Sequence, residues 1–368
     1  MRQQWIDECF MHQALSLALR GMGKTSPNPM VGCVIVKDGK VVGRGWHDHV
    51  GGPHAEVGAM REAGDLCRGA TAYVTLEPCS HQGRTPPCAP ALAAAQISRC
   101  VAAIRDPNPK VSGRGLDILR QAGVEVECGV LAGEAVHLNR GFLSLQTRRR
   151  PWITIKAAVS LDGDMALLSG ESQWITGEDA RAVGHMLRSE NDAVLVGANT
   201  LVNDDPSLTV RHTDGLQPRP VVLCGDLRRL DGNFKALTER TIVFTSEGQT
   251  VPSNCPAQII AVPADRGGRL DLEHVVQKLG ELGIARLLVE SGGTLCSSFI
   301  RQGLADECHL FIAPLLMGQG IKMSGDILLD SMKQALPFAF NEVRRVGKDI
   351  WVEGGLPCSL DWLKQLER

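Results

Sequence analysis

Short β-type segments alternate with amphipathic helical segments along most of this 368-residue chain, and this alternation limits the fold more than any other feature. A strand, a helix and another strand in succession favour a parallel crossover, which packs helices on the faces of a mainly parallel sheet. A chain of this length has room for two or three domains of ordinary size. We therefore expect two α/β domains, each with its own core.

In the first half, the apolar positions of residues 7–22 recur at helical spacing. The segment VGCVIVKDGKVVG predicts two strands joined at Asp38-Gly39, a pair that favours a type I′ hairpin turn. The same criteria predict further helices at 54–63, 89–96 and 115–121 and further strands at 72–76, 100–104 and 124–128.

Three adjacent arginines and a proline, Arg148 to Pro151, interrupt this pattern. Proline cannot continue a helix, and a β-rich run, WITIKAAVS, follows at once. We interpret the arginines as a solvated helix end and place a domain boundary there, with domains at 1–147 and 151–368. In the second half we expect strands at 153–159, 193–196, 221–224, 241–245, 259–262 and 287–290, helices at 179–189, 272–282 and 295–302, and an antiparallel end built from 307–313 and 339–352.

Charge and composition exclude several classes of protein. The 39 basic and 41 acidic residues give a net charge of −2, whereas proteins that neutralise nucleic-acid phosphates usually carry a basic excess. No apolar run approaches the ~18 residues of a membrane helix, and charged residues in the first ten positions argue against a secretory signal. Twelve scattered cysteines suit free thiols in a reducing compartment. We expect a cytoplasmic protein that binds neither membrane nor nucleic acid.

The most specific signal is His54-Ala55-Glu56, followed by Cys79 and Cys88. One imidazole and two thiolates are a suitable set of three protein ligands for Zn²⁺, which leaves a fourth position open to water. Each of the three donors lies at the end of an expected helix or strand. Glu56 is close enough to exchange protons with a metal-bound water, whose pKa falls to about 7.

Other interpretations of these residues are weaker. A purely structural zinc would have four protein ligands, and His81 or His47 would have to supply the fourth. A single cysteine is usually a small buried apolar residue rather than a ligand. The joint arrangement with His54 and Glu56 favours the open site.

The order H-x-E followed by P-C is the signature of zinc-dependent base deaminases. Here eight residues separate the two cysteines instead of two. The segments PNPMVGCVIV, LEPCSHQGRTPPC and DPNPKVSGRG closely resemble the deaminase half of the bifunctional riboflavin biosynthesis enzymes, and the longer loop fits that family. The resemblance implies a three-layer cytidine-deaminase-like domain, with Asn28, otherwise a rigid turn residue between two prolines, as a substrate contact. His81 and Arg84 are further candidates for a substrate phosphate.

The second half lacks a G-x-G-x-x-G motif after its first strand, so an ordinary Rossmann site is not indicated. It does have Gly292-Gly293 at a strand-to-helix junction, where free N–H groups can hold a phosphate. Two adjacent glycines at the end of a strand are also common in turns that bind no ligand.

The motifs 156–163, 169–176 and 197–211 resemble the reductase half of the same riboflavin family. That resemblance implies a dihydrofolate-reductase-like domain that uses NADPH. Asp164 departs from the family, which more often has a basic residue there. By motif match the cofactor contacts are Ala158, Trp174, Thr200, Asp204, Ser246, Gly292, Gly293, Thr294, Leu295, Cys296, Ser297 and Ser298, and the substrate contacts are Ser172, Arg188, Leu208, Arg211 and Glu290. Arg188 and Arg211 suit a ribose phosphate because guanidinium groups bind phosphate bidentately. Trp174, if it is not simply a packing residue, could cover the nicotinamide.

The resemblance implies two successive reactions on a small phosphorylated pyrimidine. Zinc-dependent deamination of 2,5-diamino-6-(5-phosphoribosylamino)pyrimidin-4-one precedes NADPH-dependent reduction of the ribosyl group to 5-amino-6-(5-phosphoribitylamino)uracil. A homodimer through the second domain would be usual for the family. Two alternatives remain: a nucleoside or nucleic-acid deaminase with an unrelated appended domain, and a zinc-stapled scaffold without turnover, in which Glu56 would be dispensable.

Overall fold

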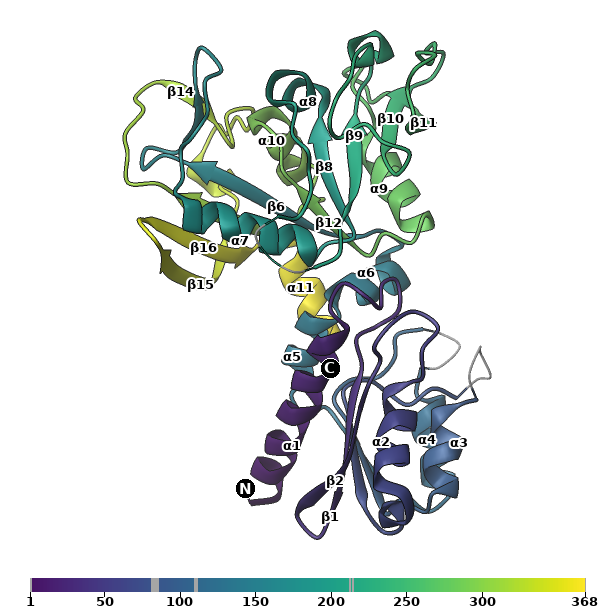
Figure 1. Cartoon of the computed structure of the whole chain (residues 1–368). Helices are drawn as coiled ribbons and strands as arrows, with labels where there is room; N and C mark the ends of the chain where they lie inside the picture. The colour runs from purple at the N-terminus through teal and green to yellow at the C-terminus, as the bar shows by residue number, and fades with distance from the viewer. Residues whose placement is uncertain (1, 81–85, 109–111, 212, 214, 368) are drawn as a thin grey trace. The chain divides into compact units, whose positions relative to one another are not determined.

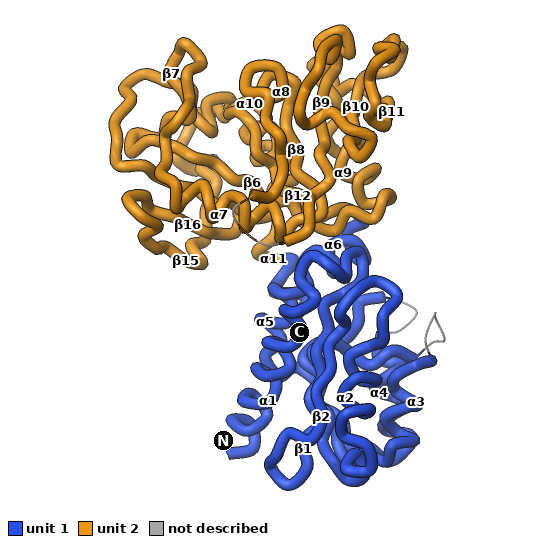
Figure 2. Tube along the Cα trace, viewed as in Figure 1, with its two compact units in different colours: residues 1–149, 362–368 blue, residues 150–361 orange. Residues whose placement is uncertain are grey.

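The computed structural model describes residues 2–80, 86–108, 112–211, 213 and 215–367, and the chain divides into two compact units (Figure 2). Unit 1 comprises residues 1–149 and 362–368, and unit 2 comprises residues 150–361. The last seven residues therefore belong to the unit built by the first half of the chain. None of the described helices combines the length and apolarity that a membrane crossing requires.

Unit 1 is built on a five-stranded sheet in the order β2-β1-β3-β4-β5. β1 pairs antiparallel with β2 and β3, whereas β3, β4 and β5 run parallel. The predicted hairpin is present, and Asp38 and Gly39 have the positive φ angles, 49° and 73°, that its turn requires. The strands are β1 (Gly32–Lys37), β2 (Lys40–Trp46), β3 (Thr71–Val74), β4 (Arg99–Ala102) and β5 (Glu125–Cys128).

Helices cover both faces of this sheet, so unit 1 has three layers (Figure 1). Along β1, Val34 and Val36 enter the core beneath α1, α5 and α6, while Cys33 and Ile35 enter the core beneath α2, α3 and α4. This alternation is the period-two pattern of a strand buried on both faces. The helices are α1 (Arg2–Ala18), α2 (Ala55–Ala63), α3 (Cys88–Ala94), α4 (Arg114–Gln121), α5 (Ala132–Leu138) and α6 (Arg140–Arg148).

Unit 2 contains a nine-stranded sheet in the order β11-β10-β9-β8-β12-β6-β13-β16-β15. The strands from β11 to β13 are parallel, and β16 and β15 add the predicted antiparallel end. β7 and β14 form a separate pair. The strands are β6 (Trp152–Val159), β7 (Asp164–Leu167), β8 (Ala193–Gly197), β9 (Arg219–Leu223), β10 (Ile242–Ser246), β11 (Gln258–Val262), β12 (Arg286–Val289), β13 (Glu307–Ile312), β14 (Gly320–Lys322), β15 (Ala339–Val346) and β16 (Asp349–Gly355).

Two cores also fill the faces of the larger sheet, with Leu195 and Phe244 in one and Val194 and Val243 in the other. The helices are α7 (Glu178–Ser189), α8 (Ala198–Asp204), α9 (Leu272–Glu281) and α10 (Gly293–Arg301), with a short 3₁₀ helix, η3 (Leu227–Leu230). The last helix, α11 (Pro357–Leu366), begins in unit 2, and its residues from Trp362 onward belong to unit 1.

The interpretation of the arginine run as merely solvated is wrong for Arg150. Its guanidinium donates to both carboxylate oxygens of Asp306, at 2.7 and 2.9 Å, and that carboxylate is fully buried. Asp306 also accepts from the amide of Ile153 at 2.9 Å. The pair fixes the start of β6, because an uncompensated charge at a buried position would be costly.

Candidate functional sites

The three predicted metal donors of unit 1 meet at one point. His54 precedes the first residue of α2, Cys79 follows β3, and Cys88 begins α3. The His54 Nδ1 atom lies 3.5 Å from Cys79 Sγ and 3.3 Å from Cys88 Sγ. Tetrahedral Zn²⁺, with Zn–S near 2.3 Å and Zn–N near 2.0–2.1 Å, places a nitrogen and a sulfur ligand about 3.6 Å apart. Both nitrogen–sulfur distances therefore suit zinc, and all three donor atoms lie within 4.8 Å of one another.

The surroundings of Cys79 favour a thiolate. The amide of Cys88 donates to Cys79 Sγ at 3.3 Å. Hydrogen bonding from the Cys88 thiol lowers the pKa of Cys79, and the hydrogen bond with His54 adds to this effect against the opposing effect of burial. A thiolate is the form of cysteine that binds metals.

Glu56 lies in the first turn of α2, two residues after His54, and only 4% of it is exposed. It is not part of the three-donor group formed by the described residues. Burial raises the pKa of its carboxyl to about 7, because an apolar environment disfavours the charged form. A carboxyl that can be protonated near neutral pH can both accept and return a proton.

Two close backbone approaches hold these elements in place. A Cβ atom on Gly45 of β2 would lie 2.0 Å from the carbonyl oxygen of Ala55, so glycine lets the first turn of α2 rest on β2. A Cβ atom on Gly115 of α4 would lie 1.9 Å from the carbonyl oxygen of Pro78, directly before Cys79. Larger residues at either position would displace a donor.

The Glu77 side chain anchors the loop that carries Cys79. Its buried carboxylate accepts from the amides of Gly113 and Gly115 at 2.9 Å, and from the amide of Asp106 at 3.2 Å. A carboxylate at the N-terminus of α4 is favourable because the free N–H groups of the first turn need acceptors. No role for Glu77 followed from the sequence, although it stands within the LEPC segment.

The remaining predicted residues of unit 1 do not belong to the group of three metal donors. Asn28 lies in an exposed turn, where its amide donates to the Thr25 carbonyl at 2.7 Å. His47 is buried, its ring stands edge-on to that of His54 with centroids 6.0 Å apart, and its Nδ1 lies 3.2 Å from the Pro53 carbonyl oxygen. His81 and Arg84 lie outside the described residues.

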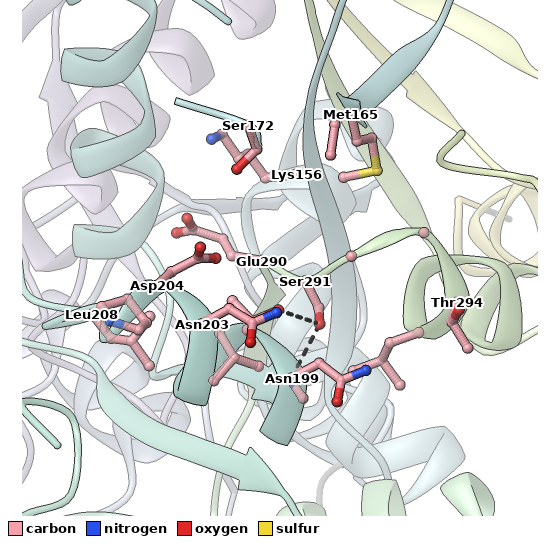
Figure 3. Close-up of a pocket in the computed structure, with 18 of the residues that line it drawn as sticks. Lys156, Met165, Ser172, Asn199, Asn203, Asp204, Leu208, Glu290, Ser291 and Thr294 are labelled. Atoms are coloured by element: carbon pink, nitrogen blue, oxygen red, sulfur yellow. Dashed lines mark hydrogen bonds between the residues drawn. The ribbon is translucent and has the colours of Figure 1, made fainter. Parts of the chain in front are cut away.

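Unit 2 contains a cavity of about 1830 Å³. It lies at the C-terminal ends of the parallel strands, where Gly197 ends β8, Gly225 follows β9 and Glu290 follows β12. This edge is the usual ligand site of an open α/β sheet. Figure 3 shows Ser291 between Asn203 of α8 and Thr294 of α10. The Ser291 hydroxyl accepts from the Gly197 amide at 3.1 Å.

Most of the predicted cofactor and substrate residues line this cavity. Cys296 and Ser297 do not: Cys296 is buried in the core, and the Ser297 hydroxyl donates to the Met323 carbonyl at 2.9 Å. Ser246 is also absent from the wall, although its hydroxyl donates to the carbonyl of the lining residue Gly225 at 2.7 Å. The predicted residues that line the wall are Ala158, Ser172, Trp174, Arg188, Thr200, Asp204, Leu208, Arg211, Glu290, Gly292, Gly293, Thr294, Leu295 and Ser298.

Arg188 and Glu290 form a bidentate ion pair in the cavity wall. The Arg188 Nε and Nη2 atoms donate to the two carboxylate oxygens of Glu290 at 2.6 and 2.8 Å. Burial alone would raise the pKa of Glu290, but the paired guanidinium lowers it below its ordinary value. Lys156 lines the same region, and burial lowers its pKa. This lysine was not predicted as a site residue from the sequence, although it opens the first reductase-like motif.

Unlike Arg188, Arg211 forms no ion pair with a carboxylate among the described residues. Its Nη1 donates to the hydroxyls of Ser207 and Thr209, and the residue is exposed at the cavity. Trp174 is 69% exposed, with the Arg181 guanidinium 4.6 Å from its ring centroid, so it is not a core packing residue.

The unexpected Asp164 is compensated by Lys322. The Lys322 ammonium lies 3.2 and 3.3 Å from the two oxygens of the fully buried Asp164 carboxylate, which joins β14 to β7. A Cβ atom on Gly293 would lie 2.1 Å from the Lys322 carbonyl oxygen. The contact between β14 and the start of α10 therefore needs glycine at position 293.

Comparisons with known proteins match both halves of the chain. Residues 4–104 match the cytidine and deoxycytidylate deaminase zinc-binding region, and residues 151–352 match the RibD C-terminal domain. These matches confirm the predicted combination of folds. The second match disfavours the alternative in which the appended domain is unrelated to riboflavin biosynthesis.

Whole-chain relatives agree with these matches. The chain is 44% identical to the riboflavin biosynthesis protein RibD of Aquifex aeolicus and 42% identical to that of Escherichia coli; each alignment covers 94% of this chain and 97% or 98% of the relative. A solved structure of Acinetobacter baumannii RibD has a TM-score of 0.88 at 40% identity, and covers 96% of this chain and 99% of that one. The Thermotoga maritima diaminohydroxyphosphoribosylaminopyrimidine deaminase/5-amino-6-(5-phosphoribosylamino)uracil reductase has a TM-score of 0.87 at 36% identity, with the same coverage.

Proposed function

This chain belongs to the family of the riboflavin biosynthesis protein RibD, and we propose that unit 1 carries its deaminase reaction and unit 2 its reductase reaction. The chain is a bifunctional deaminase and reductase of riboflavin biosynthesis that uses Zn²⁺ and NADPH and acts on a small molecule. The division is supported by the positions of the two family matches, since 4–104 falls in unit 1 and 151–352 in unit 2.

The observation that carries the deaminase assignment is the meeting of His54, Cys79 and Cys88 beside the buried carboxyl of Glu56. When bound by these three residues, zinc supplies the Lewis acidity that activates water for attack on a carbon. Glu56 takes a proton from the attacking water and delivers it to the pyrimidine ring nitrogen. A second transfer through the same carboxyl protonates the amine, which leaves as ammonia while the carbonyl forms.

The substrate of this step is 2,5-diamino-6-(5-phosphoribosylamino)pyrimidin-4-one, which belongs to the compound class in the name of the Thermotoga relative. Asn28 is our proposed contact to the pyrimidine, because its short polar side chain stands in an exposed turn. The near-neutral charge of the chain supports a small substrate over a polynucleotide.

The reductase step converts the ribosyl group to the ribityl group of 5-amino-6-(5-phosphoribitylamino)uracil. When bound, NADPH supplies the hydride, and the protein orients the two reactants. The free N–H groups at Gly292, Gly293 and Thr294 hold the cofactor pyrophosphate. The further cofactor contacts that we propose on the cavity wall are Ala158, Trp174, Thr200, Asp204, Leu295 and Ser298.

Substrate contacts occupy the other part of the wall. Arg211, supported by the hydroxyls of Ser207 and Thr209, binds the ribose phosphate. Arg188 is already neutralised by Glu290, so we assign this pair to the polar groups of the sugar and base rather than to the phosphate. Ser172 and Leu208 complete the wall around them.

We also propose a cytoplasmic homodimer. All twelve cysteines are free, which suits a reducing compartment and keeps Cys79 and Cys88 available to zinc. β15 is the outer strand of the nine-stranded sheet in unit 2, and Phe340 and Val343 on it are 69% and 56% exposed. A second copy of the chain would cover them. Sedimentation equilibrium would contradict this proposal if it gave the mass of a single chain.

The two reactions are tested by following two products of the purified enzyme separately. Without NADPH, the diaminopyrimidine phosphate is expected to release one equivalent of ammonia and accumulate the deaminated ribosyl compound. Adding NADPH is then expected to consume one equivalent of reductant. NADPH oxidation with no prior or accompanying ammonia release would contradict the proposed order.

A further inference from the structure

Two arginines border one end of the cavity in unit 2. Arg229 lies on η3 after β9, and Arg269 lies on the loop between β11 and α9. Both are exposed, and within the part of the chain that the structure describes neither side chain makes a hydrogen bond or ion pair. Their guanidinium donors therefore face solvent at the cavity.

Two other cations near this end are already neutralised. Arg228, next to Arg229, donates to both oxygens of Asp226 at 2.9 and 2.8 Å and does not line the cavity. Lys235 lines it, but its ammonium pairs with Asp205 at 3.0 Å. Of these four basic residues, Arg229 and Arg269 are the two that line the cavity without an ion pair to any described residue.

Both arginines lie in turns that are stabilised by an aspartate side chain bonded to the backbone. The Asp226 carboxylate accepts from the Arg228 amide at 3.1 Å at the start of η3. The Asp265 carboxylate accepts from the amides of Gly267 and Arg269 at 2.8 and 2.9 Å. These aspartates line the cavity too: both oxygens of Asp226 accept from Arg228, and Asp265 accepts its two backbone hydrogen bonds through Oδ1.

Sheet order relates this end to the rest of the cavity. β9, β10 and β11 are parallel neighbours, so Arg229, Ser246 at the end of β10, and Arg269 follow three adjacent strand ends. With strands about 4.8 Å apart, the ends of β9 and β11 are about 10 Å from each other, and the loops that follow them line the same cavity. Glu290 follows β12, two strands beyond β9, and the α10 turn comes directly after it.

This order matches the order of groups in NADPH. The nicotinamide must meet the substrate, the pyrophosphate follows, and the adenosine with its 2′-phosphate lies at the far end. We have assigned Arg211 to the substrate phosphate and the turn before α10 to the cofactor pyrophosphate. The 2′-phosphate of NADPH is the anion that remains for the end of the cavity bordered by Arg229 and Arg269.

We propose that Arg229 and Arg269 bind the 2′-phosphate of NADPH and so select NADPH over NADH. This inference rests on the proposed placement of the cofactor in this cavity. Guanidinium groups bind phosphate with charge-assisted hydrogen bonds, and NADH offers only a hydroxyl at the same position.

The test measures equilibrium binding, without substrate, by the fluorescence of the reduced nicotinamide. Each of Arg229→Ala and Arg269→Ala in the full-length enzyme is expected to weaken NADPH binding roughly 10-fold, and the double variant roughly 100-fold. NADH binding is expected to stay within about 2-fold of the unchanged protein, since no phosphate contact is lost. Arg266→Ala is the matched control, because Arg266 is exposed on the same loop as Arg269 but does not line the cavity.

The inference is overturned if the double variant keeps its NADPH preference, either because both coenzymes bind normally or because both weaken equally. A Gly292→Val variant separates this failure from failure of the cofactor placement. If that variant blocks both coenzymes while the double arginine variant stays selective, only the arginine assignment is wrong. If both coenzymes bind the Gly292→Val variant normally, the placement itself is wrong.

Discussion

Glutamine in place of Glu56 is expected to reduce ammonia release by roughly 10²–10⁴-fold, the usual contribution of a positioned general acid–base group. The side chain is buried in the first turn of α2, and glutamine keeps its size while removing its ability to carry a proton. Zinc content, measured by atomic absorption, and NADPH oxidation with the deaminated substrate are expected to stay unchanged.

Glu62→Gln is the matched control for this variant. Glu62 lies on the same helix, its side chain is 46% exposed, and it pairs with Arg44 at 2.9 Å. Its loss is expected to leave both activities intact. If Glu56→Gln released ammonia at the normal rate, the proton-transfer role would be wrong and the zinc-stapled scaffold interpretation would regain support.

Valine in place of Gly292 is expected to abolish most of the reductase activity, with a loss of about 100-fold or more. Gly292 has an ordinary φ of −66°, and an added Cβ would meet no atom within 4 Å. The fold can therefore accept the side chain, which would occupy the space at the start of α10 where we place the pyrophosphate. Ammonia release is expected to continue, because Gly292 belongs to unit 2.

The measurement is NADPH oxidation with the deaminated substrate, together with a thermal melt of each variant. Gly292→Ala should give a smaller loss, because a methyl group fills less of the same space. An unchanged reductase rate in a folded Gly292→Val variant would contradict our placement of the cofactor. Position 293 is unsuitable for this test, since a Cβ there would strike the backbone of Lys322 at 2.1 Å.

The sequence predicted those features that are local in the chain. The Asp38-Gly39 turn fixes a hairpin from four neighbouring residues, and the H-x-E and P-C segments placed donors at helix and strand ends that the structure brings together. The antiparallel end of the second sheet was also predicted, from the extended segments 307–313 and 339–352, although the turn that divides the second segment into β15 and β16 was not.

Long-range partners were not predictable from one sequence. Arg188 and Glu290 are 102 residues apart, and Arg150 and Asp306 are 156 apart, so tertiary structure alone makes them pairs. The arginine at 150 therefore resembled a solvated residue, and Arg188 resembled a free phosphate ligand. Only the complete fold shows which charges are already satisfied.

Some short helices and strands were not predicted, for a different reason. α5 and α6 have seven and nine residues, and isolated helices of that length have little stability without tertiary packing. Their apolar residues Val136 and Leu143 are ordered by the core that they share with α1. The pairing of β14 with β7, which brings Lys322 to Asp164, likewise joins segments far apart in the chain.

Removal of zinc from the intact enzyme tests the central claim most directly. After treatment with a strong chelator, ammonia release from the diaminopyrimidine phosphate is expected to fall to background, because His54, Cys79 and Cys88 then hold no metal. NADPH oxidation with the deaminated substrate is expected to continue at its full rate, and added Zn²⁺ should restore ammonia release. Ammonia release that persists in protein shown to be free of zinc would contradict the account.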